Sequence, residues 1–182
     1  MHKIRVYVDT SVFGGTQDEE FFVESNNFFD HVRLGEYMVL LSDETQRELA
    51  NSPDVVQDVW QNLPPGSVEL ISIDDEARFL ANEYITAKVL GETSIGDALH
   101  VAVATVAGAD LILSWNFKHI VNFSRIRGFS TLIIMRTLFY KIPPHLPLPK
   151  GGKLPLFDKE GPPVCVPRTG RGEILQCMSI QF

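Results

Sequence analysis

Residues 98–107 form an apolar run that constrains the fold of this chain more than any other stretch. His100 and Thr105 are the only polar side chains within it. A helix of this composition has no face suited to water, so we expect it to lie inside the domain. Asp97 stands just before the run, and a carboxylate at the start of a buried helix needs polar or charged partners.

Short apolar segments with strand character alternate with helical segments along the chain. The sequence predicts strands at residues 4–8, 37–41, 68–73 and 110–114, and helices at residues 18–34, 42–51, 53–63, 74–90 and from 97 onward. This order is typical of an α/β fold, and we expect a three-layer α/β/α sandwich with a mostly parallel central sheet of four or five strands. The first strand is followed by a segment that ends in Gly14-Gly15, which predicts a turn.

The composition changes near residue 142. Eight of the eleven prolines lie in the last 41 residues, where segments such as Leu146-Pro147-Leu148-Pro149 can continue neither a helix nor a central strand. We therefore divide the 182 residues into one domain, residues 1–141, and a proline- and glycine-rich tail, residues 142–182, that is poorly ordered or foreign to the native protein. A docked functional arm is the alternative for the tail.

Charge and cysteine content limit the class of protein. Residues 1–141 carry 20 acidic and 11 basic side chains, which argues against a broad surface that coats nucleic acid. A small nucleic-acid site bridged by metal ions is compatible with that charge. Both cysteines, Cys165 and Cys177, lie in the tail, and no apolar run approaches the ~18 residues of a membrane span. We expect a cytoplasmic protein with no membrane partner.

Three carboxylates stand where a parallel sheet collects its ligands. Asp9 follows the first strand, Glu48 lies in a short helix after the second strand, and Asp97 opens the buried helix. Each has a structural alternative, namely a turn for Asp9 and a capping box, Thr45 to Glu48 or Ser94 to Asp97, for the other two. Clustered carboxylates repel one another, and a hard divalent cation such as Mg²⁺ or Mn²⁺ relieves that repulsion. A site of this kind is typical of phosphoryl-transfer chemistry.

Four stretches of the chain, taken together, resemble a PIN domain of the VapC-toxin type. They are residues 6–12 with Asp9-Thr10-Ser11, the pair Glu48-Leu49, residues 97–104 and residues 109–117. In order and spacing, the likeness covers residues 3–127. It implies a metal-dependent ribonuclease for single-stranded RNA, which is the toxin of a toxin–antitoxin pair, forms a homodimer and is inhibited by an antitoxin protein.

The resemblance also implies roles for individual residues. Asp9, Glu48 and Asp97 are the implied metal ligands, and together with Asn116 they are the implied catalytic residues. The family commonly has a fourth acid where this chain has Asn116, and an amide oxygen brings no charge, which argues against a second metal ion. The last strand of the family has no counterpart after Tyr140.

Four polar side chains near these acids are assigned to the substrate: Ser11, Ser114, His100 and Lys118. His100 lies one turn from Asp97, so it either contacts a substrate phosphate or is a hydrogen-bonded core histidine. Lys118 belongs to a basic stretch that suits backbone phosphates or a solvated helix face. Trp115 either stacks on a base or packs against the end of a strand.

The sequence therefore predicts a Mg²⁺- or Mn²⁺-dependent endoribonuclease. The alternative is a PIN-like module that binds RNA or a partner protein without cutting, which the missing fourth acid and the acidic composition favour. A metal-dependent phosphatase for small phosphate esters differs from the first reading only in the size of its substrate.

Overall fold

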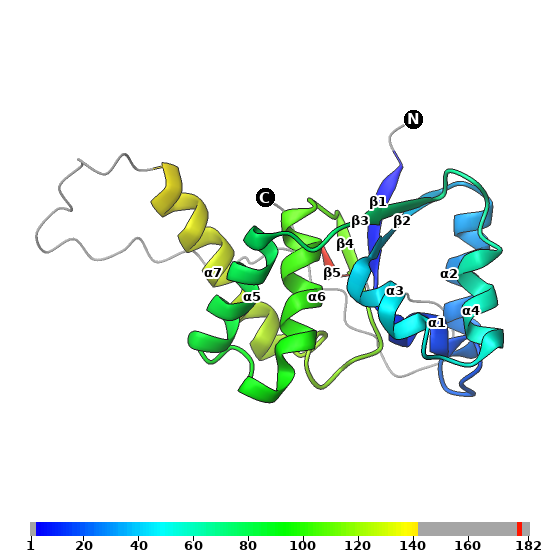
Figure 1. The fold of residues 1–182 in the computed structure, drawn as a ribbon, viewed down its shortest axis with the longest axis horizontal. Coiled ribbons are helices and arrows are strands. Elements are labelled where there is room, and N and C mark those ends of the chain that lie inside the picture. Colours follow the sequence, from blue (N-terminus) through cyan, green and yellow to red (C-terminus); the bar gives the residue numbers. More distant parts are fainter. Residues whose placement is uncertain (1–2, 142–177, 180–182) are drawn as a thin grey trace, which may run out of the picture.

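A computed structural model describes residues 3–141 and the pair Met178–Ser179 (Figure 1). At its centre is a five-stranded sheet with strand order β3-β2-β1-β4-β5. Four strands run parallel: β1 (Ile4–Val8), β2 (Tyr37–Ser42), β3 (Val68–Ile71) and β4 (Leu111–Leu113). β5 (Met178–Ser179) pairs antiparallel with β4. The rest of the tail lies outside the described residues, so its prediction stays a prediction.

Helices cover both faces of the sheet, which confirms the three-layer α/β/α sandwich. Figure 1 shows α5 (Asp75–Thr86), α6 (Ile95–Val106) and α7 (Phe123–Lys141) on one side of the strands, and α1 (Thr10–Gly15), α2 (Phe22–Arg33) and α4 (Asp54–Gln61) on the other. Helix α3 (Asp43–Leu49) begins where β2 ends, and a 3₁₀ turn, η1 (Glu92–Ser94), leads into α6. No helix in the described part of the chain combines the length and hydropathy needed to cross a bilayer.

The side chains of the strands alternate between two apolar cores, one on each face of the sheet. Tyr7, Leu40 and Ile112 pack on the side of α5, α6 and α7, whereas Val8 and Leu41 pack on the side of α1, α2 and α4. Full burial of one such aliphatic side chain contributes about 1.5–3 kcal/mol relative to leaving it exposed. Because both faces are covered, these strands are nearly continuous apolar runs, which is why the sequence predicts them.

Helix α6 is the buried helix that the sequence predicts. Ala98, Val101 and Ala102 are fully buried, and His100 is 3% exposed. Helix α5 packs along α6 on the side away from the sheet (Figure 1). Because α6 precedes the parallel strand β4, its N-terminal end lies at the edge of the sheet where the strands end. Asp97 is therefore carried to that edge.

The prediction of a turn at Gly14-Gly15 is wrong, because residues 10–15 form helix α1. Gly15 serves close packing instead. A Cβ at this position would lie 2.7 Å from Nε1 and 2.9 Å from Cδ1 of Trp115. The absence of a side chain lets α1 approach the segment after β4.

Helix α5 ends at residue 86, four residues before the predicted end. Lys88 adopts a φ of 57°, and the N–H of Val89 donates to the carbonyl of Tyr84 at 3.0 Å. These features form a Schellman closure, which usually uses glycine at the left-handed position. A lysine gives no sequence signal for this closure, so the sequence predicts a helix that continues to residue 90, before Gly91.

Arg5 ties the start of β1 to the C-terminal end of α6. Its guanidinium pairs with Glu69 of β3 at 2.7 Å and donates to the carbonyls of Ala107 at 2.8 Å and Gly108 at 2.9 Å. Carbonyls at the end of a helix lack partners within the helix and favour a cation. Asp110 lies at the same end of the sheet and accepts the backbone N–H of Arg5 at 2.7 Å.

Candidate metal centre

The carboxyl ends of the parallel strands bring the candidate residues to one edge of the sheet. β1 leads into Asp9, β2 leads into α3 with Glu48, and β4 leads into Ser114. The first turns of α6 reach the same edge. Ligands of α/β folds bind at this edge, which is what the sequence predicts here.

Asp9 is 5% exposed, and its two carboxylate oxygens have different surroundings. Oδ2 accepts hydrogen bonds from the hydroxyls of Ser11 and Ser114, both at 2.6 Å. Oδ1 lies 3.8 Å from Nε2 of His100. Both serines, which the sequence assigns to the substrate, therefore contact Asp9 and fix the orientation of its carboxylate.

Glu48 lies in the last turn of α3 and faces the same space. Its Oε2 accepts a hydrogen bond from the hydroxyl of Thr10 and lies 3.3 Å from Nε2 of His100. The N-cap of α3 is Ser42, whose hydroxyl accepts the N–H of Thr45. The capping box weighed for Thr45 and Glu48 therefore does not form, and Glu48 is free to serve the site.

His100 joins the two carboxylates to the interior of the sheet. Its side chain is 4% exposed, with Nε2 toward Glu48 and Asp9. Nδ1 lies 2.7 Å from the hydroxyl of Tyr7, and that hydroxyl lies 2.8 Å from Oγ of Ser42. The structure therefore supports the hydrogen-bonded alternative for His100 and places it inside the carboxylate cluster.

The imidazole of His100 and the neighbouring carboxylates shift each other's pKa values toward the charged forms. Burial lowers the pKa of His100, but the hydrogen bond to Glu48 and the electrostatic attraction of Tyr7, Asp9 and Glu48 outweigh burial and raise that pKa to about 10. Burial likewise raises the pKa of Glu48, and hydrogen bonds from His100 and Thr10, together with nearby positive charge, outweigh it and lower that pKa. Without a metal ion, the two carboxylates thus favour the protonated form of His100.

Asp97 and Asn116 form a pair of their own. Nδ2 of Asn116 donates to Oδ1 of Asp97 at 2.6 Å, and Oδ1 of Asn116 accepts the N–H of His119 at 3.0 Å. Ser94, the N-cap of α6, makes no side-chain capping bond, so the capping box weighed for Asp97 does not form. Asn116 therefore orients Asp97.

Among the described residues, one ligand atom from each of Asp9, Glu48 and His100 lies within 4.8 Å of the other two. Atoms bonded at about 2.1 Å to one cation are about 3 Å apart in neighbouring positions and about 4.2 Å apart across it. The distances from Nε2 of 3.3 Å and 3.8 Å agree with this range. The donor set fits a divalent metal ion. Of the three predicted ligands, the structure brings Asp9 and Glu48 together, adds His100, and leaves Asp97 outside the group.

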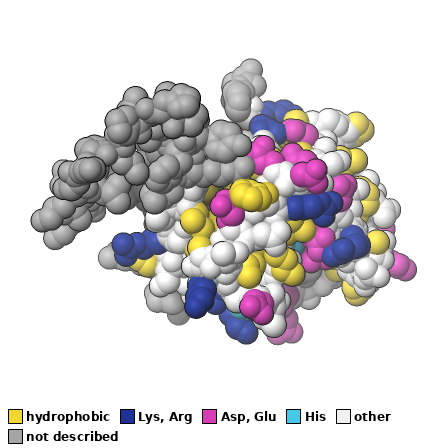
Figure 2. Space-filling view, turned by 60° about the vertical axis from the view of Figure 1, so that its left-hand side comes forward, with side chains coloured by type: hydrophobic (Ala, Val, Ile, Leu, Met, Phe, Trp, Pro, Cys, Tyr) yellow, Lys and Arg dark blue, Asp and Glu magenta, His cyan; other side chains and the backbone are white. Residues whose placement is uncertain are grey.

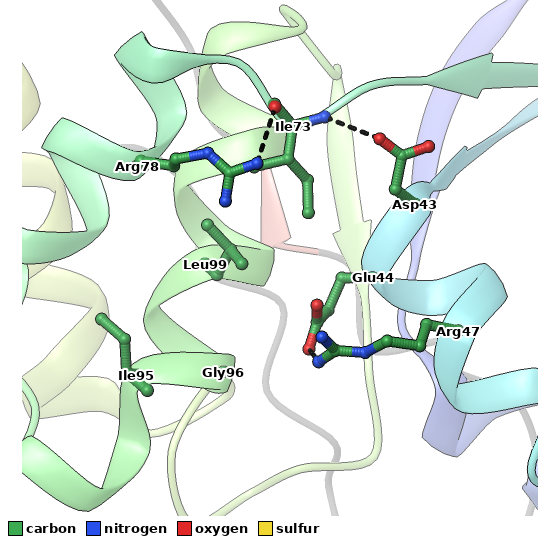
Figure 3. A pocket seen from close by; sticks show the side chains of 8 residues that line it. All are labelled: Asp43, Glu44, Arg47, Ile73, Arg78, Ile95, Gly96 and Leu99. Atoms are coloured by element: carbon green, nitrogen blue, oxygen red, sulfur yellow. Dashed lines mark hydrogen bonds and ion pairs between the residues drawn. The ribbon is translucent and has the colours of Figure 1, made fainter.

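A hollow of about 340 Å³ is lined by residues of α3 and α6, among other segments (Figure 3). Its lining combines arginines, acids and apolar side chains from α3, α5, α6 and the segment before α5: Arg47, Arg78, Asp43, Glu44, Ile73, Ile95 and Leu99. Figure 3 shows Arg47 turned toward Glu44, its ion-pair partner, and Arg78 on the other side of the hollow, where it donates to the carbonyl of Ile73. Because α3 also carries Glu48 and α6 also carries Asp97, the hollow and the centre share the same two helices.

The remaining predicted residues lie in the segment after β4. Lys118 is exposed. Trp115 is packed: its ring stacks on Phe21 with centroids 5.0 Å apart, and its Nε1 donates to Oγ of Ser25 at 2.9 Å. This supports the packing alternative for Trp115. Figure 2 shows acidic, basic and apolar side chains interspersed on one face, so the acidic excess is not gathered into a single patch on that face.

Sequence reasoning missed two residues that hold the cluster, Tyr7 and Thr10. The apolar strand around Tyr7 predicts only a core residue. A signal was present, because a tyrosine hydroxyl inside a core needs a hydrogen-bond partner. Thr10 follows Asp9 directly, at the start of a helix that the sequence does not reveal.

No family model and no curated protein sequence matches this chain. Among solved structures, VapC20 of Mycobacterium tuberculosis, described as a toxin that cleaves the sarcin–ricin loop, has a TM-score of 0.50 at 13% identity and covers 65% of this chain and 95% of that chain. VapBC2 of Rickettsia felis, solved with a DNA fragment from its promoter, has a TM-score of 0.45 at 16% identity and covers 64% of this chain and 93% of that chain. The likeness to VapC20 shows that this chain has a VapC-like PIN fold.

Proposed function

We propose that this protein is a divalent-metal-dependent endoribonuclease that cleaves single-stranded RNA, as a VapC-type toxin. The observation that carries the proposal is the group formed by Asp9, Glu48 and His100 at the carboxyl edge of the sheet. The fold shared with VapC20, a toxin that cleaves the sarcin–ricin loop, supports it. So does the chemistry of the donor set, because clustered carboxylates at such an edge suit Mg²⁺ or Mn²⁺.

In this proposal Asp9 and Glu48 hold the metal ion, Mg²⁺ or Mn²⁺. When bound, the metal ion polarises the phosphodiester and activates the attacking water. Ser11 and Ser114 hold Oδ2 of Asp9, so that Oδ1 faces the centre. Asp97, which Asn116 holds through Oδ1, accepts the proton of the attacking water in this proposal.

The hollow that α3 and α6 help to line is the proposed path of the RNA. Arg78 and Arg47 line it, and each guanidinium matches a phosphate oxygen pair. Lys118, exposed beyond Asn116, supplies a further positive charge for the backbone. The apolar side chains of Ile95 and Leu99 offer contact to a sugar or a base.

We also propose the assembly and location that go with this role. An antitoxin protein binds the chain and inhibits it, the chain forms a homodimer, and it acts in the cytoplasm. Co-expression with a small protein encoded beside it, followed by size-exclusion chromatography with light scattering, measures both the complex and the oligomeric state.

Carboxylates at the two ends of the sheet provide the test of activity and its control. Asp9→Asn and Asp97→Asn are expected to reduce cleavage of an unstructured fluorogenic RNA in Mn²⁺ to the level without protein, with an unchanged circular dichroism spectrum. Asp110→Asn is the matched control, because Asp110 contacts Arg5 at the far end of the sheet. Full cleavage by Asp97→Asn in Mn²⁺ would refute the proposed role of Asp97, and full cleavage by both site variants would refute the nuclease.

A binding module without catalytic activity is the second candidate function. The observation in its favour is that Nε2 of His100 already contacts both carboxylates, so an imidazolium there would offset part of their charge without a metal ion. Calorimetric titration with Mn²⁺ separates the two candidates. The nuclease requires a binding event that Asp9→Asn removes, whereas the module predicts no binding at millimolar Mn²⁺.

A further inference from the structure

We propose that His100 ligates the metal ion through Nε2 and that the centre consequently prefers Mn²⁺ to Mg²⁺. This inference rests on the proposed function, because it concerns the same centre. It replaces the three carboxylates that the sequence predicts with one imidazole nitrogen and two carboxylates. Asp97, the third predicted ligand, is engaged with Asn116 instead.

The hydroxyl of Tyr7 fixes the orientation of the His100 imidazole through Nδ1. Nδ1 lies 2.7 Å from the hydroxyl of Tyr7, which is fully buried in β1, and the two rings meet edge to face with centroids 5.9 Å apart. The Tyr7 hydroxyl is held in turn by Oγ of Ser42 at 2.8 Å. Metal-ligating histidines typically fix their second nitrogen through such a hydrogen bond. The ring therefore has one nitrogen committed to the fold and the other presented to the centre.

The presented nitrogen faces the carboxylates and not the solvent. Nε2 lies 3.3 Å from Oε2 of Glu48 and 3.8 Å from Oδ1 of Asp9, with the His100 side chain 4% exposed. The two serine hydroxyls hold the other oxygen of Asp9, so Oδ1 is the oxygen available to a cation. Nε2 thus lies within reach of a cation that these two carboxylates would hold.

The nitrogen donor determines which metal ion the centre prefers. Mg²⁺ favours an all-oxygen octahedron and keeps most of its water, whereas imidazole suits ions further along the transition series. Mn²⁺ accepts both carboxylate oxygen and imidazole nitrogen. We therefore expect the ratio of the Mg²⁺ to the Mn²⁺ dissociation constant to exceed that of an all-carboxylate site by about tenfold or more.

Electron spin echo envelope modulation of the Mn²⁺-loaded full-length protein tests the ligation directly. The expected spectrum shows a ¹⁴N coupling, which changes to that of ¹⁵N when only histidine is ¹⁵N-labelled; this measurement needs no variant. His100→Gln is expected to abolish the coupling, and His119→Gln, a histidine beside Asn116, to retain it. Tyr7→Phe is expected to retain the coupling and to weaken Mn²⁺ binding by about 10-fold, because the ring loses its support.

Calorimetry with Mn²⁺ and Mg²⁺ completes the test. The inference is supported if His100→Gln weakens Mn²⁺ binding more than Mg²⁺ binding, by about tenfold or more. Bound Mn²⁺ without a histidine nitrogen coupling, or equal losses for the two ions, overturns the inference and leaves the proposed nuclease intact. Absence of Mn²⁺ binding to the wild-type protein would overturn the metal centre itself, and with it both proposals.

Discussion

Gly15 and Gly14 are adjacent in α1 and are expected to respond to alanine in opposite ways. A Cβ at Gly15 would lie 2.7 Å from Nε1 of Trp115 and in closer contact still with Oγ of Ser25, whereas no atom lies within 4 Å of a Cβ at Gly14. The hydrogen bond between Trp115 and Ser25, 2.9 Å long, passes directly over Gly15. Gly15→Ala must therefore move the indole or α1.

The magnitude follows from the competing effects. Overpacking in a close contact costs about 1–3 kcal/mol, and loss of a hydrogen bond costs about 0.5–1.5 kcal/mol. Alanine in place of glycine in a helix gains about 0.5–1 kcal/mol at either position. Gly15→Ala is thus expected to lower the free energy of unfolding by about 1–3 kcal/mol, and Gly14→Ala to raise it by up to about 1 kcal/mol. For a chain of this size the difference corresponds to a Tm gap of roughly 2–16 °C.

Thermal unfolding followed by circular dichroism measures this gap. Trp115 and Trp60 are the two tryptophans of the chain, so a Trp60→Phe background makes Trp115 the sole indole fluorophore. Its emission should shift in Gly15→Ala and not in Gly14→Ala. The backbone N–H of Trp115 also donates to Ser11, which orients Asp9, so weaker Mn²⁺ binding should accompany the shift. Equal Tm values for the two variants, with unchanged emission, would refute the packing argument.

Three further predictions concern the buried histidine and the arginine at the far end of the sheet. In a chelating buffer, the free energy of unfolding should fall as pH rises from about 6.5 to about 10. The reason is that His100 has a pKa of about 10 in the folded protein and about 6.5 in the unfolded chain. Urea titrations should show a slope of at most about 1.4 kcal/mol per pH unit, and His100→Gln should remove that slope. Tyr7→Phe removes the partner of a buried ring nitrogen, so urea unfolding should show a loss of about 1–3 kcal/mol, and an unchanged midpoint would contradict the assigned contact. Arg5→Lys keeps the charge but not the fork that reaches both Glu69 and the end of α6, so Tm should fall by a few degrees while calorimetry shows unchanged Mn²⁺ affinity.

The sequence predicts those parts of the fold that depend on local pattern. Residues 6–8 of β1, residues 39–41 of β2 and most of α6 are apolar because they are buried, and that property is visible in the residues themselves. The errors occur where a distant contact decides the structure. Gly14-Gly15 resembles a turn until Trp115 is known to lie against it, and β5 exists only as a two-residue partner of β4, too short to produce a pattern.

The candidate site, like the fold, is predictable where local pattern and strand order determine it, and not where a distant side-chain contact does. Asp9 and Glu48 meet because parallel strands end at one edge of the sheet, and topology alone gives that result. The third member of the group depends on side-chain length and direction. Side chains on a helix point toward its N-terminal end, so the long imidazole of His100 reaches back to the ligand position that the sequence assigns to Asp97. The spacing of residues along the sequence does not predict how far the imidazole extends.

The ties between Arg5 and the last carbonyls of α6 determine how this helix can move. A helix fixed at one end pivots there, and its displacement grows with distance from the pivot. Helix α6 spans 12 residues, or about 18 Å, from Val106 back to Ile95, so a small rotation about the anchored end would produce its largest movement near Asp97 and at the rim of the hollow. We expect hydrogen exchange to be slowest at the anchored end and fastest in the first turn. We therefore expect the mouth of the site to move more than the end of α6 that the Arg5 guanidinium holds through two carbonyls on the opposite side of the domain.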